Sequence, residues 1–219
     1  MDARRRNIVI GLGIAPLGLL GFAPRAALAQ PRPGANFTEL NPAQPVEAKG
    51  KVEVIEFFWY GCPHCYSLEP LLEDWVKRLP ADAEFRRVPA VLSQTWLAHA
   101  QVYYAFEALS VTERLHRPFF DAVHRERLQV SNQQAFEEWL RRNNVEPKKF
   151  NYAARSFGVQ SQVKRAARVT AAYRIDGVPA LAVHGRFTIS AGQAPSREGM
   201  LEIADYLIGE SRKSLAAVK

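Results

Sequence analysis

Cysteine is scarce in this chain of 219 residues, which holds only Cys62 and Cys65. Two cysteines exclude a small fold held together by several disulfides. A bridge between residues this close would remove only about 2 kcal/mol of unfolded-state entropy, before any strain is subtracted. A chain of this length can bury an adequate core without such a staple. The pair therefore calls for a reason other than stability.

Metal-ligand patterns are also missing. A structural zinc site usually takes four ligands, often from two cysteine pairs, and this sequence has one pair. Its five histidines, at positions 64, 99, 116, 124 and 184, show no ligand spacing relative to one another. We expect neither a bound metal nor another cofactor, with a metal-binding module as the alternative.

The chain has no long uninterrupted apolar run. Residues 8–22 are apolar but hold four glycines and Pro16, and they fall short of the about 20 residues that a membrane-spanning helix needs. Three arginines precede this run, and Ala27-Leu28-Ala29 follows it with the small-x-small form of a signal-peptidase site. This layout predicts a cleaved bacterial secretory signal over residues 1–29, with a membrane anchor as the alternative. The export route, Sec or twin-arginine, stays open.

Excess charge is small once this segment is removed. The formal net charge is +7, of which residues 1–29 carry +3, so +4 remains on the exported part. This modest charge argues against a dedicated nucleic-acid binder. Export is expected to place the chain in the periplasm, an oxidising compartment in which a cysteine pair can form a disulfide.

What the sequence does contain is an abrupt change of pattern at the two cysteines. Residues 52–60, VEVIEFFWY, are rich in β-branched and aromatic side chains and predict a buried strand that Gly61 ends. After Cys65, apolar residues recur at helical spacing: Leu68, Leu71, Leu72, Trp75, Val76 and Leu79. The cysteines are therefore expected on the first turn of a helix, where Pro63 loses no intrahelical hydrogen bond.

This position favours redox chemistry. Side chains three apart on a helix lie about 5–6 Å from each other, within reach of a disulfide. Unpaired backbone N–H groups and the helix dipole stabilise an anion at the helix start, so Cys62 is the candidate thiolate. His64 can add a donor or a positive charge, and Cys65 is expected to be more buried. A stabilised thiolate makes the disulfide easier to reduce, and therefore a stronger oxidant.

The segment VEVIEFFWYGCPHCYSLEP, residues 52–70, resembles the active-site segment of the DsbA family of periplasmic thiol:disulfide oxidoreductases. A looser likeness extends to FTEL, residues 37–40, and to IDGVPALAVHGRF, residues 175–187. The resemblance implies a thioredoxin fold with an inserted all-helical domain and a redox-active Cys62–Cys65 disulfide. Pro63 and His64 would tune the thiolate, and this dipeptide favours oxidation over the reducing Gly-Pro of thioredoxins.

The resemblance also implies roles outside the two cysteines and the dipeptide between them. The Val178–Pro179 bond would be cis, would face the cysteines, and would present the Val178 backbone to an extended substrate. Glu56 would lie beneath the site and influence proton transfer at the second cysteine. The alternative for Glu56 is a buried carboxylate paired with a lysine or arginine for structure alone. Trp59 and Tyr60 are expected to wall the site.

The rest of the chain predicts the order β, β, α, β, helical block, β, β, α. Strands are expected at residues 37–40, 52–60, 84–90, 179–183 and 186–189, the last two joined by a hairpin at His184-Gly185. A capping box of Ser131 and Gln134 is expected to start one helix of the block. The predicted parts are a signal at 1–29, thioredoxin-like segments at 30–92 and 175–219, and a helical insertion at 93–174.

The predicted function is oxidation of newly exported, reduced proteins through a mixed disulfide on Cys62. Following the resemblance, a DsbB-like membrane quinone reductase would reoxidise the pair, and the protein would act as a monomer. A periplasmic disulfide reductase or isomerase is one alternative. A peptide-binding chaperone with incidental cysteines is another.

Overall fold

The computed structural model of the protein describes residues 30–217. The predicted signal, residues 1–29, lies outside the described residues. From Pro31 onward the chain forms one compact unit. Among the helices of residues 30–217, none is long and apolar enough to cross a bilayer.

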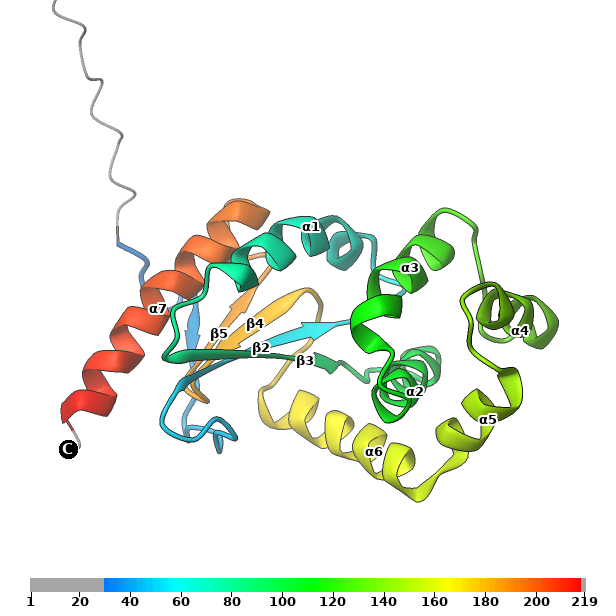
Figure 1. Cartoon of the computed structure of the whole chain (residues 1–219). Helices are drawn as coiled ribbons and strands as arrows, with labels where there is room; N and C mark the ends of the chain where they lie inside the picture. The colour runs from blue at the N-terminus through cyan, green and yellow to red at the C-terminus, as the bar shows by residue number, and fades with distance from the viewer. Residues whose placement is uncertain (1–29, 218–219) are drawn as a thin grey trace, which may run out of the picture. The chain divides into compact units, whose positions relative to one another are not determined.

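A five-stranded mixed sheet forms the centre of this unit (Figure 1). Its strands are β1 (Thr38–Glu39), β2 (Val52–Phe58), β3 (Ala83–Pro89), β4 (Ala180–Val183) and β5 (Phe187–Ser190), in the spatial order β1-β5-β4-β2-β3. The β2–β3 pair is parallel, and the other neighbouring pairs are antiparallel. All seven residues of β2 are buried, which explains why that segment is apolar apart from two glutamates.

Helices cover both faces of the sheet (Figure 1). On one face, α1 (Pro63–Lys77) and α7 (Arg197–Ala217) pack against Val54 and Leu181 of the central strands. On the other face, the end of α6 (Phe157–Ala172) packs against Ile55. Val54 and Ile55 point to opposite faces because successive side chains of a strand alternate.

Five consecutive helices lie between β3 and β4 in the sequence: α2 (Gln94–Ala108), α3 (Thr112–His124), α4 (Gln133–Arg142), α5 (Pro147–Arg155) and α6. Their shared core is aromatic, with Phe119 in edge-on contact with both Phe106 and Trp139. Phe58 and Tyr60, at the end of β2, belong to the same apolar cluster as the two cysteines. The central strand therefore delivers the cysteine pair to the boundary between the sheet and the helical layer.

The predicted element order is confirmed, and so is the hairpin. β4 and β5 are joined by His184 and Gly185, whose φ angles are 48° and 67°. A Cβ on Gly185 would collide with the backbone carbonyl of Gln44, so only glycine fits this turn. The domain boundaries at residues 92 and 174 stay predictions.

The predicted capping box of Ser131 and Gln134 is wrong. The N-cap of α4 is Asn132, whose side-chain oxygen accepts a hydrogen bond from the Ala135 N–H at 3.2 Å. Asparagine caps a helix as well as serine does. The helix therefore begins one residue later than the sequence pattern indicated, at Gln133.

Candidate active site

The two cysteines lie at the junction of β2 and α1. Cys62 is the N-cap residue of α1, with extended backbone angles, and Pro63 is the first helical residue. The carbonyl of Cys62 accepts the first helical hydrogen bond, from the Tyr66 N–H at 3.0 Å. Both cysteines are free thiols in this structure. The sequence prediction of a strand–turn–helix junction is confirmed.

Gly61 has a steric reason to be glycine. A Cβ at this position would run into the indole ring of Trp59. That ring stacks on Trp96 of α2, with ring centroids 4.7 Å apart and planes 6° from parallel. The glycine therefore lets an aromatic pair pack directly beside the residue that precedes Cys62.

The Cys62 thiol has its pKa lowered to about 6. The largest cause is a hydrogen bond from the Cys65 side chain to the Cys62 sulfur, and the backbone N–H groups of Cys65 and His64 and the charge of His64 add to it. Burial acts in the opposite direction but does not prevail. A thiol with this pKa is mostly a thiolate at neutral pH, which is the reactive form.

The Cys65 thiol is shifted the other way. Its side chain has no exposed surface, and burial is the largest cause that raises its pKa, followed by its interaction with Cys62 and by the charge of Glu56. The two sulfurs are neighbours in the structure and opposite in acidity. One favours the anion and the other favours the neutral thiol.

The loop before β4 completes the exposed side of the site. This side, called the upper side, consists of Cys62, Pro63, His64 and the Val178 backbone. The Val178–Pro179 peptide bond is cis, as the resemblance implied. The Val178 carbonyl accepts a hydrogen bond from the Cys62 thiol at 3.3 Å. Pro63 and His64 are exposed next to it, so the residues that an incoming chain can reach are Cys62, this dipeptide and the backbone at Val178.

A buried network of charged and polar side chains, the acid–base floor, lies beneath the cysteines. It consists of Glu56, Arg87, Glu69, His116 and Tyr60. The Arg87 guanidinium bridges two carboxylates, with Nε 3.0 Å from Glu56 Oε2 and Nη2 3.0 Å from Glu69 Oε2. His116 Nε2 lies 3.1 Å from Glu69 Oε1, and the Tyr60 hydroxyl lies 2.8 Å from His116 Nδ1.

Two carboxylates that share one arginine cannot both keep their usual acidity in a dry interior. Burial, followed by the negative charge of Glu69, raises the pKa of Glu56 to about 8, against the opposing effect of Arg87. Burial also acts to raise the pKa of Glu69, but the hydrogen bond with His116, together with the charge and hydrogen bond of Arg87, lowers it below the usual value. Glu69 is therefore the carboxylate of the pair and Glu56 the carboxylic acid near neutral pH.

The tautomer of His116 follows from its neighbours. Burial lowers the pKa of His116, so its ring is neutral, and burial raises that of Tyr60, which keeps its hydroxyl proton. A neutral imidazole donates from one nitrogen and accepts at the other. His116 Nε2–H therefore donates to the Glu69 carboxylate, and Nδ1 accepts from the Tyr60 hydroxyl.

Comparison with known proteins agrees with this geometry. The model of the DSBA-like thioredoxin domain matches residues 53–198. The thiol:disulfide interchange protein DsbA of Azotobacter vinelandii is 36% identical over 212 residues, covering 95% of this chain and 99% of that protein. The crystal structure of Pseudomonas aeruginosa DsbA superimposes with a TM-score of 0.79 at 36% identity, over 85% of this chain and 96% of that one.

This chain belongs to the DsbA-like thioredoxin family. The predicted fold class, a thioredoxin fold with a helical insertion, is thereby confirmed. The chain is a thiol:disulfide oxidoreductase, as its motif and its relatives agree. The oxidoreductase from Xylella fastidiosa, at 28% identity and a TM-score of 0.78, has the same DsbA architecture.

The structure of this DsbA-like chain brings together the site residues that the sequence singled out. Pro63 and His64 are exposed beside Cys62, and Cys65 and Pro179 are buried next to them. Glu56 lies in the floor, where it does pair with an arginine and also has a raised pKa. Trp59 borders the site as expected, whereas Tyr60 has no exposed surface and is a floor residue rather than a wall.

Sequence reasoning missed the other members of the floor. Glu69 had a usable signal, because it follows Cys65 by four residues and precedes Leu72 by three, on the buried side of α1. Arg87 lies directly opposite Glu56 in the β2–β3 register, which no local pattern reveals. His116 is 47 residues from Glu69 in sequence, and its role depends entirely on tertiary packing.

The histidines without ligand spacing also acquire positions in this DsbA-like fold. His99, His116 and His124 surround Tyr60, and His124 Nε2 lies 2.8 Å from the Tyr60 carbonyl oxygen. Burial lowers the pKa of His99 to about 4, so it is neutral. Within residues 30–217, no cluster of three or more metal-ligating side chains is found.

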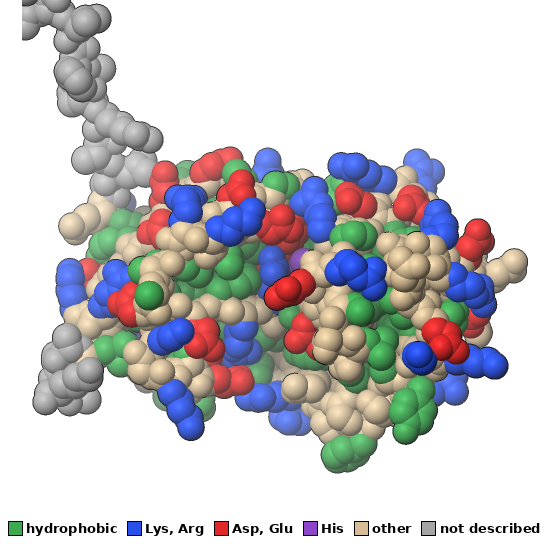
Figure 2. Space-filling model, in the orientation of Figure 1, with side chains coloured by type: hydrophobic (Ala, Val, Ile, Leu, Met, Phe, Trp, Pro, Cys, Tyr) green, Lys and Arg blue, Asp and Glu red, His purple; other side chains and the backbone are tan. Residues whose placement is uncertain are grey.

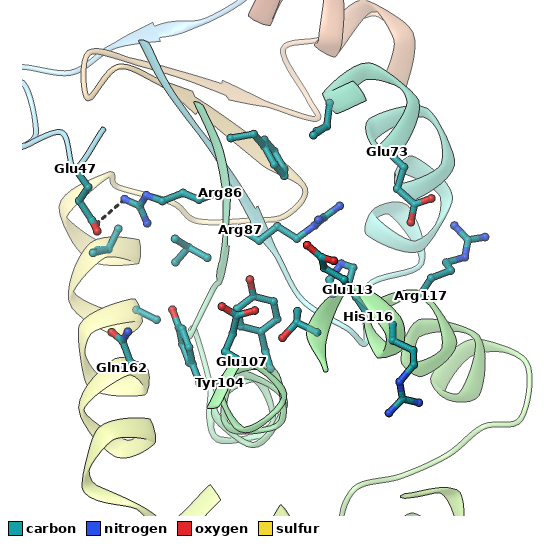
Figure 3. Close-up of a pocket in the computed structure, with 18 of the residues that line it drawn as sticks. Glu47, Glu73, Arg86, Arg87, Tyr104, Glu107, Glu113, His116, Arg117 and Gln162 are labelled. Atoms are coloured by element: carbon teal, nitrogen blue, oxygen red, sulfur yellow. Dashed lines mark ion pairs between the residues drawn. The ribbon is translucent and has the colours of Figure 1, made fainter. Parts of the chain in front are cut away.

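A groove of about 860 Å³ reaches the floor. Arg87 and His116 belong both to the floor and to the lining of this groove, whereas the cysteines do not line it (Figure 3). Figure 3 shows Arg86 turned the other way, paired with Glu47 at 3.0 Å. Two residues of the floor are thus reachable through a groove that the cysteines do not line.

Proposed function

We propose that this protein oxidises newly exported proteins in the periplasm by donating a Cys62–Cys65 disulfide. One observation supports the direction above all others: the two thiols have opposite pKa shifts, to about 6 at Cys62 and upward at Cys65. A stabilised Cys62 thiolate stabilises the reduced enzyme, so a substrate dithiol readily reduces the enzyme's disulfide and becomes oxidised itself.

The exchange has two steps. A substrate thiolate attacks Cys62 Sγ, forming a mixed disulfide and breaking the Cys62–Cys65 bond, so that Cys65 leaves with the electron pair. The second substrate thiolate then attacks the substrate sulfur of the mixed disulfide, and Cys62 leaves as a thiolate. The substrate loses two electrons, the enzyme gains them, and the low pKa of Cys62 makes it the better leaving group in the second step.

Protons must follow the charge at Cys65. The raised pKa of Cys65 means that its sulfur takes up a proton when it leaves. A thiolate that remained there would be a buried, uncompensated charge. Glu56 is the protonated carboxyl beneath it, with a pKa near 8. Glu56 is therefore the candidate proton donor, and Arg87 stabilises the carboxylate that remains.

The upper side of the site fits an extended peptide. In its protonated form the Cys62 thiol donates a hydrogen bond to the Val178 carbonyl, so the Val178 backbone lies beside Cys62, where it can pair with a substrate chain by strand addition. Backbone pairing reads no particular side chain, which suits a catalyst of many different substrates. A DsbB-like membrane quinone reductase is the proposed partner for reoxidation.

The deciding experiment is the reduction potential of the pair as a function of pH, measured by equilibration with glutathione and read from tryptophan fluorescence. Trp59, stacked on Trp96 beside the cysteines, supplies the signal. We expect a potential well above the about −270 mV of thioredoxin. The slope should change from about −59 to about −30 mV per pH unit near pH 6, since above the Cys62 pKa only one proton accompanies two electrons.

The alternatives give other outcomes. A potential near or below that of thioredoxin would identify a reductase, with the same chemistry run in the opposite direction. If the reduction potential changes with pH at the same slope below and above pH 6, Cys62 is not the low-pKa thiol. A chaperone with incidental cysteines would keep its full activity as Cys62→Ser.

A further inference from the structure

The segment from α5 to α6 has an unusual charge. Residues 147–175 contain seven lysines and arginines and no aspartate or glutamate. Since the exported part of the chain has a net charge of only +4, this single segment carries more positive charge than the whole balance. Five of these cations, Lys148, Arg155, Lys164, Arg168 and Arg174, make no ion pair with any residue in the described range, whereas Lys149 and Arg165 are paired.

The same segment holds the two most exposed large apolar side chains among residues 30–217. Tyr152 is 84% exposed and Phe157 is 89% exposed, and the next such residue, Leu92, is 43% exposed. Both rings lie at the turn between α5 and α6, which the serine cap of α6 fixes through the Val159 N–H. Figure 2 shows hydrophobic side chains projecting from the edge of the molecule where Figure 1 places this turn.

Helical spacing places the rings and the cations on one surface. Lys148, Tyr152 and Arg155 follow one another at intervals of four and three residues along α5. Phe157, Lys164 and Arg168 follow at intervals of seven and four along α6. Lys148, Arg155 and both rings line one open hollow of about 510 Å³.

We propose that this surface, the α5–α6 elbow, docks the protein on an anionic phospholipid bilayer. Aromatic rings favour the boundary between lipid headgroups and acyl chains, and neighbouring lysines and arginines are attracted to anionic headgroups. A protein partner fits less well, because two rings offer too small an apolar core for a stable interface, and lysine is depleted from such cores. None of the elbow residues belongs to the redox site, so the cysteines stay accessible when the protein is docked.

The test is sedimentation of residues 30–219, the part that forms one compact unit from Pro31 onward, with phosphatidylglycerol-containing vesicles. We expect binding at low salt, little binding in 0.5 M NaCl by screening (a Debye length of about 4 Å), and none to phosphatidylcholine vesicles. Tyr152→Ser/Phe157→Ser and, separately, Lys148→Glu/Lys164→Glu should each weaken the binding at least about tenfold.

A matched control separates the elbow from general charge. Lys77→Glu/Lys213→Glu changes the net charge by the same amount at two exposed lysines of α1 and α7, and it should bind vesicles nearly as well as the parent. All variants should keep the parent's thermal midpoint and its rate of oxidising a reduced peptide, which distinguishes failure here from failure of the proposed oxidase function.

Three outcomes would overturn the proposal. The first is no binding to phosphatidylglycerol vesicles, and the second is an equal loss in the control. The third is self-association that Tyr152→Ser/Phe157→Ser abolishes without any vesicle binding, which would make the elbow an interface between two copies of the chain.

Discussion

The upper side and the floor of the redox site control the two cysteines by different means. On the upper side, the groups that lower the pKa of Cys62 belong to Cys65 and His64, within three residues in sequence. In the floor, the groups that act on Cys65 and on one another come from β2, β3, α1 and α3. Acidity at Cys62 is a property of one helix turn, whereas acidity at Cys65 depends on the assembled fold.

The difference explains why one short segment suffices to make a thiolate but not to make an oxidase. A helix start supplies N–H groups to any anion placed there. A leaving sulfur that must be protonated in a dry interior needs a buried acid, and that acid needs Arg87 and Glu69 to keep it in place.

The largest effect is expected from Cys62→Ser, because the residue supplies the attacked sulfur. Oxidation of a reduced dithiol peptide should fall below detection, while the thermal midpoint of the reduced protein changes little. Cys65→Ser is the matched control, and it should also stop turnover. When it is mixed with a peptide that carries a disulfide, its Cys62 thiolate should attack that disulfide, displace one peptide sulfur as a thiolate and stay bonded to the other, because no Cys65 thiol is present to release it. Mass spectrometry of the enzyme–peptide adduct would show this mixed disulfide. Turnover retained by Cys62→Ser would remove the upper side of the site from the mechanism.

The upper side of the site could be predicted from the sequence better than the floor. The junction of residues 52–65 was predictable, because strand composition, a breaking glycine and helical periodicity all fall within one continuous segment. Val178–Pro179 came only from likeness to a family, since nothing local indicates a cis bond. Glu56 was suspect as a lone carboxylate in a buried strand.

The floor beyond Glu56 could not be predicted for a physical reason. Arg87 is one of two adjacent arginines, and only the parallel register of β3 against β2 decides that it lies opposite Glu56. Its neighbour Arg86 lies on the other face of the sheet, where it binds Glu53. His116 comes from a helix of the insertion. Packing between distant segments decides which buried cation contacts which buried acid, and the periodicity of the sequence carries no information about that packing.

The second largest effect should come from Glu56→Gln in the oxidised protein. A carboxyl whose folded pKa is raised to about 8 from 4.5 binds its proton more tightly when folded, so the wild type loses stability as pH rises through that window. Glutamine mimics the neutral acid and avoids this loss. We expect the variant to gain about 4 kcal/mol over the wild type at pH 8 and almost nothing at pH 4.5, measured by urea unfolding.

Asp205→Asn serves as the control for that experiment, since Asp205 also has a pKa raised by burial but lies on α7, hydrogen-bonded to Trp75. Its variant should leave the peptide-oxidation rate unchanged, whereas Glu56→Gln should slow the step in which Cys65 takes up a proton. A stability difference that is pH-independent, or that turns against Glu56→Gln as the pH rises, would show that folding does not raise the pKa of Glu56.

A smaller effect is expected from His64→Leu, on the upper side. The charge of His64 is one of several causes that lower the pKa of Cys62, after the Cys65 hydrogen bond and the backbone N–H groups. Its removal should raise the Cys62 pKa, measured by thiolate absorbance, and lower the reduction potential by about 30 mV. His184→Leu, at the distant hairpin, should change neither quantity. An unchanged reduction potential in His64→Leu would show that the His64 side chain does not contribute to the acidity of Cys62.

The smallest effect on the reduction potential should come from Tyr60→Phe, at the far end of the floor. The substitution removes the hydroxyl that donates to His116 Nδ1 at 2.8 Å and leaves a buried acceptor without a partner, which costs about 1–2 kcal/mol of unfolding free energy. Tyr66→Phe is the control, because its hydroxyl donates to Asp121 in a partly exposed setting, where water replaces the lost bond and the cost is lower. Because His116 still donates to Glu69, the reduction potential of Tyr60→Phe should stay that of the wild type. A shifted potential would mean that the reduction potential of the Cys62–Cys65 pair depends on every member of the floor. The upper side and the floor would then be one coupled unit rather than two.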